Sequence, residues 1–319
     1  MEEKWGGAIV LLVLVSGWYC SCCCGCLEEE RIALLNIKHS IPPPTGYVLA
    51  SWGGHDDCCQ WVGIECNITT KRVFQLSLNY TRGWDVKGWY LNFSLFSPLE
   101  ELKSLFLWGN SIFGFMKNEG LEKSLNLHGN KLKEILNIKE LVGLNELKEL
   151  DLSNNNVKSF VVPKELIGLN RLKELDLGNN NVESFVAPKG IKRPLGLSNL
   201  EVLHLYHNYF SNTTLSSLRG LSSLKSLDLS GNKLKGILNI KELVALNNLK
   251  ELDLSYNEVE SFVAPEDTRS SSMLEVLHLI ENNNTCGSCL VQSIKAFPLI
   301  KTLDLTYSTS IEPMTTVGE

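Results

Sequence analysis

Pairs of carboxylates separated by a single residue recur in this sequence. Glu149 and Asp151 form one pair, and the same Glu-Leu-Asp triplet returns at residues 174–176 and 251–253. Side chains two positions apart on a strand share one face, so such a pair could supply the general acid and base of a hydrolase. That chemistry needs an enclosing pocket to separate the two pKa values. Because these triplets recur on an open repeat array, the sequence predicts no enzyme and no catalytic residue.

A second candidate for chemistry is the segment Cys286-Gly287-Ser288-Cys289, which has the spacing of a redox or zinc motif. No second Cys or His pair lies nearby in the sequence, and the segment falls in a turn between repeats. We therefore expect a small structural disulfide here, with two unpaired thiols as the alternative. The sequence predicts no metal and no cofactor.

Repeats of about 25 residues must position these side chains. Spaced Leu residues followed by an Asn recur throughout, and the Asn positions are 20 to 28 residues apart, the range of leucine-rich repeats. The Asn residues are Asn110, Asn130, Asn155, Asn180, Asn208, Asn232, Asn257 and Asn282. The Leu side chains should point inward from stacked parallel strands, and each Asn amide should satisfy backbone groups in a turn. The predicted fold is α/β, a leucine-rich-repeat solenoid with short parallel strands on its concave face.

Composition and the N-terminal segment limit the compartment and the partners. The 319 residues include 30 Lys and Arg against 36 Asp and Glu, and this net charge of −6 argues against nucleic-acid binding. The apolar run at residues 8–15 suits a secretory signal but is too short to span a membrane. We expect residues 1–25 to be a signal peptide of a secreted chain, with an incorrect start site as the alternative because Glu2 and Glu3 outweigh Lys4. No later segment reaches the length of a membrane span.

An end repeat exposes its core and needs a cap. Residues 28–41 place Leu34, Ile37 and Ile41 at helical spacing, and residues 57–66 read Asp-Cys-Cys-Gln-Trp-Val-Gly-Ile-Glu-Cys. This region resembles the N-terminal cap of plant extracellular leucine-rich-repeat proteins, and residues 90–107 resemble plant receptor-like proteins in particular.

The resemblance implies a disulfide-bonded helical cap over residues 26–70, with Cys26 bonded to Cys58 and Cys59 to Cys66. About ten repeats should follow over 71–310, then a tail over 311–319 without a C-terminal cap. Because Ser-Phe-Val-x-Pro at residues 159–163, 184–188 and 261–265 replaces the family's usual Gly-x-Ile-Pro, we expect less regular turns on the convex side. The ending at Glu319 suggests a truncated receptor-like protein or a partial gene model, with a naturally secreted short form as the alternative.

Side chains that alternate outward from the strands should line the concave face. Trp108, His204 and Tyr206 depart from the common Leu-Asp-Leu-Ser strand, and Asp228 and Asp253 belong to an acidic stripe. These five are the candidate ligand-binding residues. Glycosylation sequons are a separate set, and they occur at Asn67, Asn79, Asn92, Asn212 and Asn283.

The resemblance implies a non-enzymatic extracellular recognition module. Its ligand would be a peptide, protein or carbohydrate, and a receptor kinase co-receptor would carry the signal in defence or development. If the gene continues, the protein would be anchored at the plasma membrane. The alternatives are a secreted inhibitor of a cell-wall-degrading enzyme, resembling polygalacturonase-inhibiting proteins, and a non-functional truncated copy.

Overall fold

The computed structural model describes residues 25–41, 47–55, 57–82, 87–116, 124–137, 146–161, 169–186, 197–218, 220–239, 241–244, 246–263, 272–282, 289, 294–295 and 297–306. Most of the expected signal peptide, the tail over 311–319, the sequon Asn283 and Cys286 lie outside the described residues. Every structural statement below concerns the described part of the chain.

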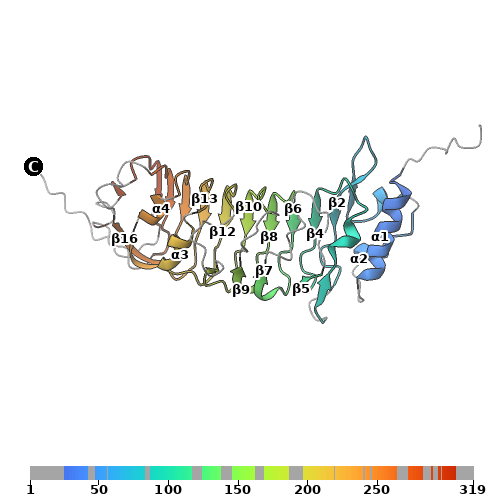
Figure 1. Cartoon of the computed structure of the whole chain (residues 1–319), viewed down its shortest axis with the longest axis horizontal. Helices are drawn as coiled ribbons and strands as arrows, with labels where there is room; N and C mark the ends of the chain where they lie inside the picture. Colours follow the sequence, from blue (N-terminus) through green and yellow to red (C-terminus); the bar gives the residue numbers. More distant parts are fainter. Residues whose placement is uncertain are drawn as a thin grey trace, which may run out of the picture.

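An 11-stranded sheet runs along one edge of an elongated solenoid (Figure 1). Its strands, in spatial order, are β1 (Ile64–Cys66), β2 (Val73–Ser77), β4 (Ser104–Phe106), β6 (Ser124–Asn126), β8 (Glu149–Asp151), β10 (Glu174–Asp176), β12 (Val202–His204), β13 (Ser226–Asp228), β15 (Glu251–Asp253), β17 (Val276–His278) and β18 (Thr302–Asp304). β1 pairs antiparallel with β2, and every later neighbour is parallel and in register at the central Leu. The predicted solenoid of short parallel strands is confirmed.

Short parallel strands also form on the opposite edge of the solenoid, where β5, β7 and β9 lie in Figure 1. Three small sheets contain β3 (Trp89–Leu91) with β5 (Ile112–Phe115), β7 (Lys133–Asn137) with β9 (Asn156–Val161) and β11 (Phe185–Val186), and β14 (Lys235–Asn239) with β16 (Glu258–Val263). The turns after the Ser-Phe-Val segments lie largely outside the described residues, so their expected irregularity stays a prediction. The described part of these segments lies in paired strands, with register irregularities between Glu134 and Ile135 and between Gly236 and Ile237. Their β-branched and aromatic residues favour strands, and Val157 and Phe160 are buried.

Few helices accompany the strands in the described part of the chain. They are α1 (Glu28–Ser40), α2 (Tyr47–Ala50), α3 (Asn212–Ser217), α4 (Lys241–Val244) and the 3-10 turns η1 (Cys58–Gln60) and η2 (Phe93–Phe96). The predicted cap helix is α1, and it ends where the Ile41 N–H bonds the Ile37 carbonyl. None of the described helices combines the length and apolar character that a bilayer crossing requires.

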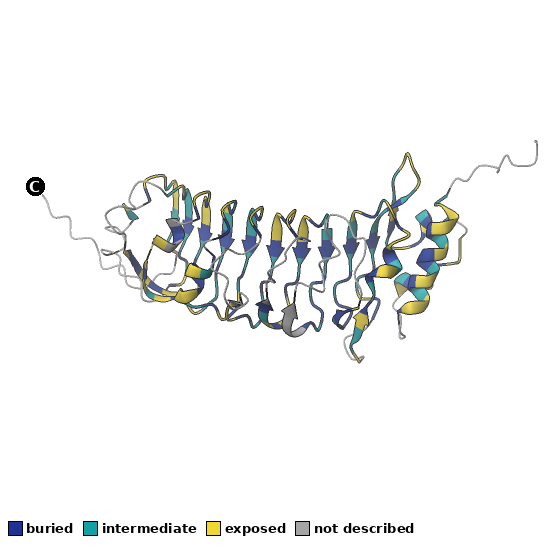
Figure 2. Cartoon of the chain, viewed as in Figure 1, coloured by how far each residue is buried: buried dark blue, intermediate teal, exposed yellow. Residues whose placement is uncertain are grey.

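The core is one continuous cluster of buried side chains, most of them Leu, which we term the Leu column. Buried residues recur in strand after strand along the solenoid (Figure 2). The central Leu of each strand of the main sheet from β4 to β17 is buried, and the next Leu along the chain seals the repeat, as Leu175 and Leu177 do. On β18, the equivalent Leu303 and Leu305 are only partly buried because no further described strand packs on them. Each repeat therefore depends on its neighbour for burial, as expected for a solenoid.

The repeated Asn side chains join neighbouring repeats. Asn180 is 7% exposed; its Nδ2 donates to the Leu177 and Gly178 carbonyls in its own repeat and to the Leu152 carbonyl in the preceding one. Its Oδ1 accepts the Val157 N–H, also in the preceding repeat. The same cross-repeat pattern recurs at Asn130, Asn155, Asn208, Asn232, Asn257 and Asn282.

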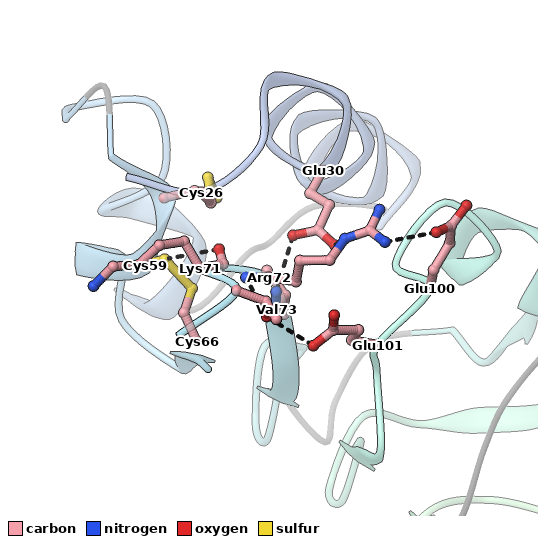
Figure 3. A network of polar contacts seen from close by, with 11 residues as sticks. Cys26, Glu30, Cys59, Cys66, Lys71, Arg72, Val73, Glu100 and Glu101 are labelled. Atoms are coloured by element: carbon pink, nitrogen blue, oxygen red, sulfur yellow. Dashed lines mark hydrogen bonds and ion pairs between the residues drawn. A yellow bond between two sulfur atoms is a disulfide. The ribbon is translucent and has the colours of Figure 1, made fainter. Parts of the chain in front are cut away.

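Two disulfides cross-link the cap, and polar contacts join it to β2 (Figure 3). Cys26 is bonded to Cys58 and Cys59 to Cys66, the two pairs that the family resemblance implies. A contact that sequence analysis missed involves Glu30, which is completely buried. Its Oε2 accepts the Val73 N–H at 2.9 Å, and its Oε1 lies 3.3 Å from Arg72 Nε. Burial raises the pKa of Glu30, while the Val73 N–H and Arg72 oppose that shift.

We predict that Asn180→Ala lowers the free energy of unfolding by about 2–4 kcal/mol, because it strips partners from several buried backbone groups at once. The matched control is Asn199→Ala, which removes an exposed amide with one described hydrogen bond and should change stability by no more than about 0.5 kcal/mol. Urea unfolding followed by circular dichroism measures both. Equal stability of the two variants would contradict a cross-linking role for the Asn ladder.

Candidate ligand-binding site

The outward side chains of the 11-stranded sheet, with the residue two positions beyond each strand, make up what we term the sheet face. Register pairing aligns equivalent positions in adjacent repeats, so that His204 stands beside Asp228 and Asp228 beside Asp253. The position two residues beyond the strand is occupied in turn by Asn79, Trp108, His128, Ser153, Gly178, Tyr206, Ser230, Ser255, Ile280 and Thr306. Small side chains fill several of these places, so the large ones stand out.

Each strand Asp has a local structural role. One carboxylate oxygen accepts the N–H of the residue two positions later, as Asp228 does from Ser230 at 2.9 Å and Asp253 from Ser255 at 2.8 Å. Asp228 also accepts the Ser230 hydroxyl. The acidic stripe therefore caps the turn after each strand that carries an Asp.

An aromatic cluster lies near the N-terminal end of the sheet face. The ring centroids of Trp108 and Tyr80 are 4.2 Å apart, and His128 meets Trp108 edge-on at 5.8 Å. Trp108 is partly buried, while Tyr80 is 47% exposed. The cluster thus presents aromatic surface to solvent in a geometry fixed by ring packing on both sides.

Tyr206 marks a second cluster, in the middle of the sheet face. Its ring lies across Gly178 of the preceding repeat, where a Cβ would come within 2.2 Å of the ring atoms. The ring is partly buried, its hydroxyl is within hydrogen-bonding reach of Ser153, and His204 lies edge-on at 6.5 Å. Burial raises the pKa of Tyr206, with Asp176 adding to the rise, while the Ser153 hydroxyl opposes it. Glycine at position 178 is what allows the ring to occupy this place.

Asp151 and Asp176 lie beside each other beneath this ring, on the paired strands β8 and β10. Asp151 accepts bonds from the Ser153 hydroxyl at 2.6 Å and from Asn126 Nδ2 at 2.8 Å. Burial raises the pKa of Asp176 to about 6, and the neighbouring Asp151 adds to the rise. The Gly178 N–H, His204 and His128 oppose it. Asp176 therefore changes its charge under mildly acidic conditions.

The candidate residues named from the sequence divide into two groups in the structure. His204, Tyr206, Asp228 and Asp253 lie on the adjacent strands β12, β13 and β15 or just beyond β12. Trp108 follows β4, four strands from β12, or about 19 Å away at roughly 4.8 Å per strand. Both aromatic residues are on the sheet face and partly exposed, but the structure does not bring them together.

Sequence reasoning missed Tyr80, His128 and Asp176 as members of these clusters. Tyr80 follows the irregular first repeat, and nothing in its local sequence indicates packing on Trp108. The signal for the central cluster was Gly178, which stands where the preceding repeat carries Ser153 and the repeat two further on carries Ser230. A Gly at that position makes room for a large side chain from the next repeat.

The described sequons differ in their surroundings. Asn67 lies in a turn next to exposed residues, and its Oδ1 accepts the Thr69 N–H. At Asn79 the sequon hydroxyl, that of Thr81, is buried and bonded to Asn110. The side chain of Asn92 accepts from Ser94, while that of Asn212 bonds the backbone of Lys235 in both directions. Glycosylation of these positions remains a prediction.

Cys289 is disulfide-bonded, and its predicted partner Cys286 lies outside the described residues. Within the described part of the chain, no three acidic, His or Cys side chains are grouped as metal ligands would be.

The chain is similar to known protein families and to individual proteins. Residues 27–67 match the leucine rich repeat N-terminal domain, residues 145–190 match a two-copy leucine rich repeat family, and residues 199–221 and 223–242 match the leucine rich repeat. The chain is 32% identical over 239 residues to Cuscuta receptor 1 of Solanum lycopersicum and 35% identical over 226 residues to Receptor like protein 21 of Arabidopsis thaliana. Each alignment covers 69% of this chain and 21% of the relative, so the chain spans about a fifth of these proteins.

The crystal structure of PEPR1-AtPEP1 superposes with a TM-score of 0.51 and 24% identity, covering 88% of this chain and 42% of that one. At this identity the likeness concerns the fold, which is the leucine-rich-repeat solenoid.

We predict that the protein loses stability as the pH rises from about 4 to about 6, because Asp176 has a higher pKa in the folded chain than in the unfolded one. The protonated form is favoured by folding, so this loss is complete above the folded pKa. Asp176→Asn should remove that part of the pH dependence. The control is Asp253→Asn, which changes the equivalent residue three strands away. Urea unfolding across this pH range measures the effect, and identical profiles for wild type and Asp176→Asn would contradict it.

Proposed function

Because the chain is a leucine-rich-repeat protein with the N-terminal domain and repeats of plant receptor-like proteins, we propose that it is a non-enzymatic extracellular recognition module. Its ligand binds along the sheet face, and a partner receptor kinase carries the signal in defence or development. The disulfides of the cap support an extracellular location, since such bonds persist in oxidising compartments. Anchoring at the plasma membrane, as part of a longer chain, is included in the proposal.

The single observation that carries this proposal is the placement of Trp108 and Tyr206. Both rings occupy sheet-face positions at which other repeats have small side chains, and both are held partly exposed by neighbouring residues. Neither ring contributes to the buried Leu column. Fixed, partly exposed aromatic side chains are the kind of group that dominates binding energy at protein interfaces.

The surroundings of the two rings suggest the chemistry of the ligand. Between them lie Asp151, Asp176 and the imidazoles of His128 and His204. A peptide with a basic residue between two apolar side chains would match this arrangement of carboxylates and aromatic rings. Each strand Asp accepts a backbone hydrogen bond in the turn that follows it, and this structural role supports binding rather than catalysis.

We predict that Tyr206→Ala weakens binding of such a peptide by about 1–3 kcal/mol, and Trp108→Ala by a similar amount. Basic-aromatic peptides selected from a displayed library on the wild-type chain serve as probes, and fluorescence anisotropy measures their affinity. Asp228→Asn should cost less than about 1 kcal/mol, because exposed charges contribute little individually.

Two further variants sharpen this test. Gly178→Ser restores the residue found in neighbouring repeats and should displace the Tyr206 ring without removing any binding group, so it should lower affinity as Tyr206→Ala does. Tyr90→Ala removes a Tyr that is 60% exposed on β3, outside the sheet face, and should leave affinity unchanged. Peptides that bind all sheet-face variants as tightly as wild type would contradict the proposal.

A further inference from the structure

A row of charged side chains lines the edge of the main sheet at which the strands begin. From β4 onward the residue directly before each strand of the main sheet is a Lys or a Glu, and the described members are Lys103, Lys148, Lys173, Glu201, Lys225, Lys250, Glu275 and Lys301. Backbone hydrogen bonds join successive members of this row, as from the Lys173 N–H to the Lys148 carbonyl and from the Glu201 N–H to the Lys173 carbonyl. The side chains are therefore spaced by one strand, about 4.8 Å.

A groove of about 500 Å³ opens in the middle of this row. It is lined by Lys148, Arg171, Lys173, Asn199, Glu201, Ser223, Lys225 and Asn248. Four cations and one carboxylate give the lining a formal charge of +3, in a protein whose net charge is −6. This groove, which we term the edge groove, is therefore positively charged, whereas the acidic stripe of the sheet face is negatively charged.

Glu201 neutralises part of this charge from within the groove. Its carboxylate lies 2.8 Å from Lys173 Nζ and 2.5 Å from Lys225 Nζ. These two hydrogen bonds lower the pKa of Glu201 to about 2, so the carboxylate stays ionised. Arg171 pairs with Glu146, while the Lys148 ammonium has no ionic partner in the described part of the chain. A surplus of positive charge therefore remains after the internal pairs are formed.

We propose that the edge groove binds an acidic peptide segment, at a site separate from the sheet face. Arg171 pairs with Glu146 through one guanidinium nitrogen, and its remaining N–H donors can bind a carboxylate of the peptide. The flanking Lys side chains supply further positive charge. Asn199 and Asn248 each donate Nδ2 to a backbone carbonyl, and an amide Oδ1 is an acceptor for peptide N–H groups. The described lining contains no aromatic ring against which a sugar face could pack, which favours a peptide over an anionic saccharide.

The test uses a labelled oligoglutamate peptide, with oligoglutamine and an oligouronate as comparison probes, and measures affinity by fluorescence anisotropy at low salt. Lys148→Gln combined with Arg171→Gln should weaken oligoglutamate binding about twofold to fivefold for each charge removed. Glu201→Gln should tighten it, because the change releases Lys173 and Lys225 from their internal partner. Unfolding curves that match wild type show that the variants are folded.

Glu275→Gln is the matched control. Glu275 bridges Lys250 and Lys301 in the same way that Glu201 bridges its two Lys residues, but it lies outside the groove. This variant has the same net charge as Glu201→Gln and should leave affinity unchanged. If both variants bound oligoglutamate more tightly by the same factor, the change in affinity would follow from net charge alone. That result would overturn the proposed site. Binding of the oligouronate in preference to oligoglutamate would overturn the peptide assignment. Neither result bears on peptide binding at the sheet face.

Discussion

The Asn side chain after each strand is the interaction on which the rest of this structure depends. It links two repeats through four backbone groups, and it does so where both chains turn away from the sheet. Without it, buried N–H and carbonyl groups would lack partners in every repeat. The residue directly before this Asn has a positive φ along the array, including Asn154, Asn179, His207 and Tyr256. The ladder thus holds even bulky residues in a backbone conformation that L-amino acids seldom adopt.

This constraint determines what the sheet face can offer to a partner. The strands are kept in register, so a position in one repeat always lies beside the same position in the next. The strand Asp is committed to its turn, which leaves the position two residues beyond the strand to distinguish one repeat from another. Trp108, His128 and Tyr206 occupy that position, and Gly178 provides the space for one of them. We therefore expect a ligand to bind at repeats whose sequence differs from the consensus of the array.

The periodic part of this molecule could be predicted from the sequence because every repeat must bury the same Leu side chains and satisfy the same turn backbone groups. The same residue pattern therefore occurs many times along the chain. The inward Leu residues, the ladder Asn and the cap helix all follow from local spacing. The contacts that it did not predict join residues far apart in the chain. Burial of Glu30 against Val73, rather than of its neighbours Glu28 or Glu29, depends on how α1 docks on β2. Packing of Tyr206 across Gly178, and of Tyr80 on Trp108, depends on side-chain directions that the period alone does not fix. The strands of the opposite edge were not predicted because each pairs with a strand of the adjacent repeat. The register of the main sheet places these segments side by side, and the local sequence does not indicate it.

The central claim is that a ligand binds on the sheet face through the two rings that the array holds partly exposed. Hydroxyl-radical footprinting of the aromatic side chains tests it most directly, with and without a library-selected peptide at saturation. Trp108 and Tyr206 should be oxidised more slowly in the complex, whereas Tyr47 in the cap and Tyr90 on the opposite edge should be oxidised at unchanged rates. Protection of Tyr90 or Tyr47, with Trp108 and Tyr206 oxidised as fast as in the free protein, would contradict it.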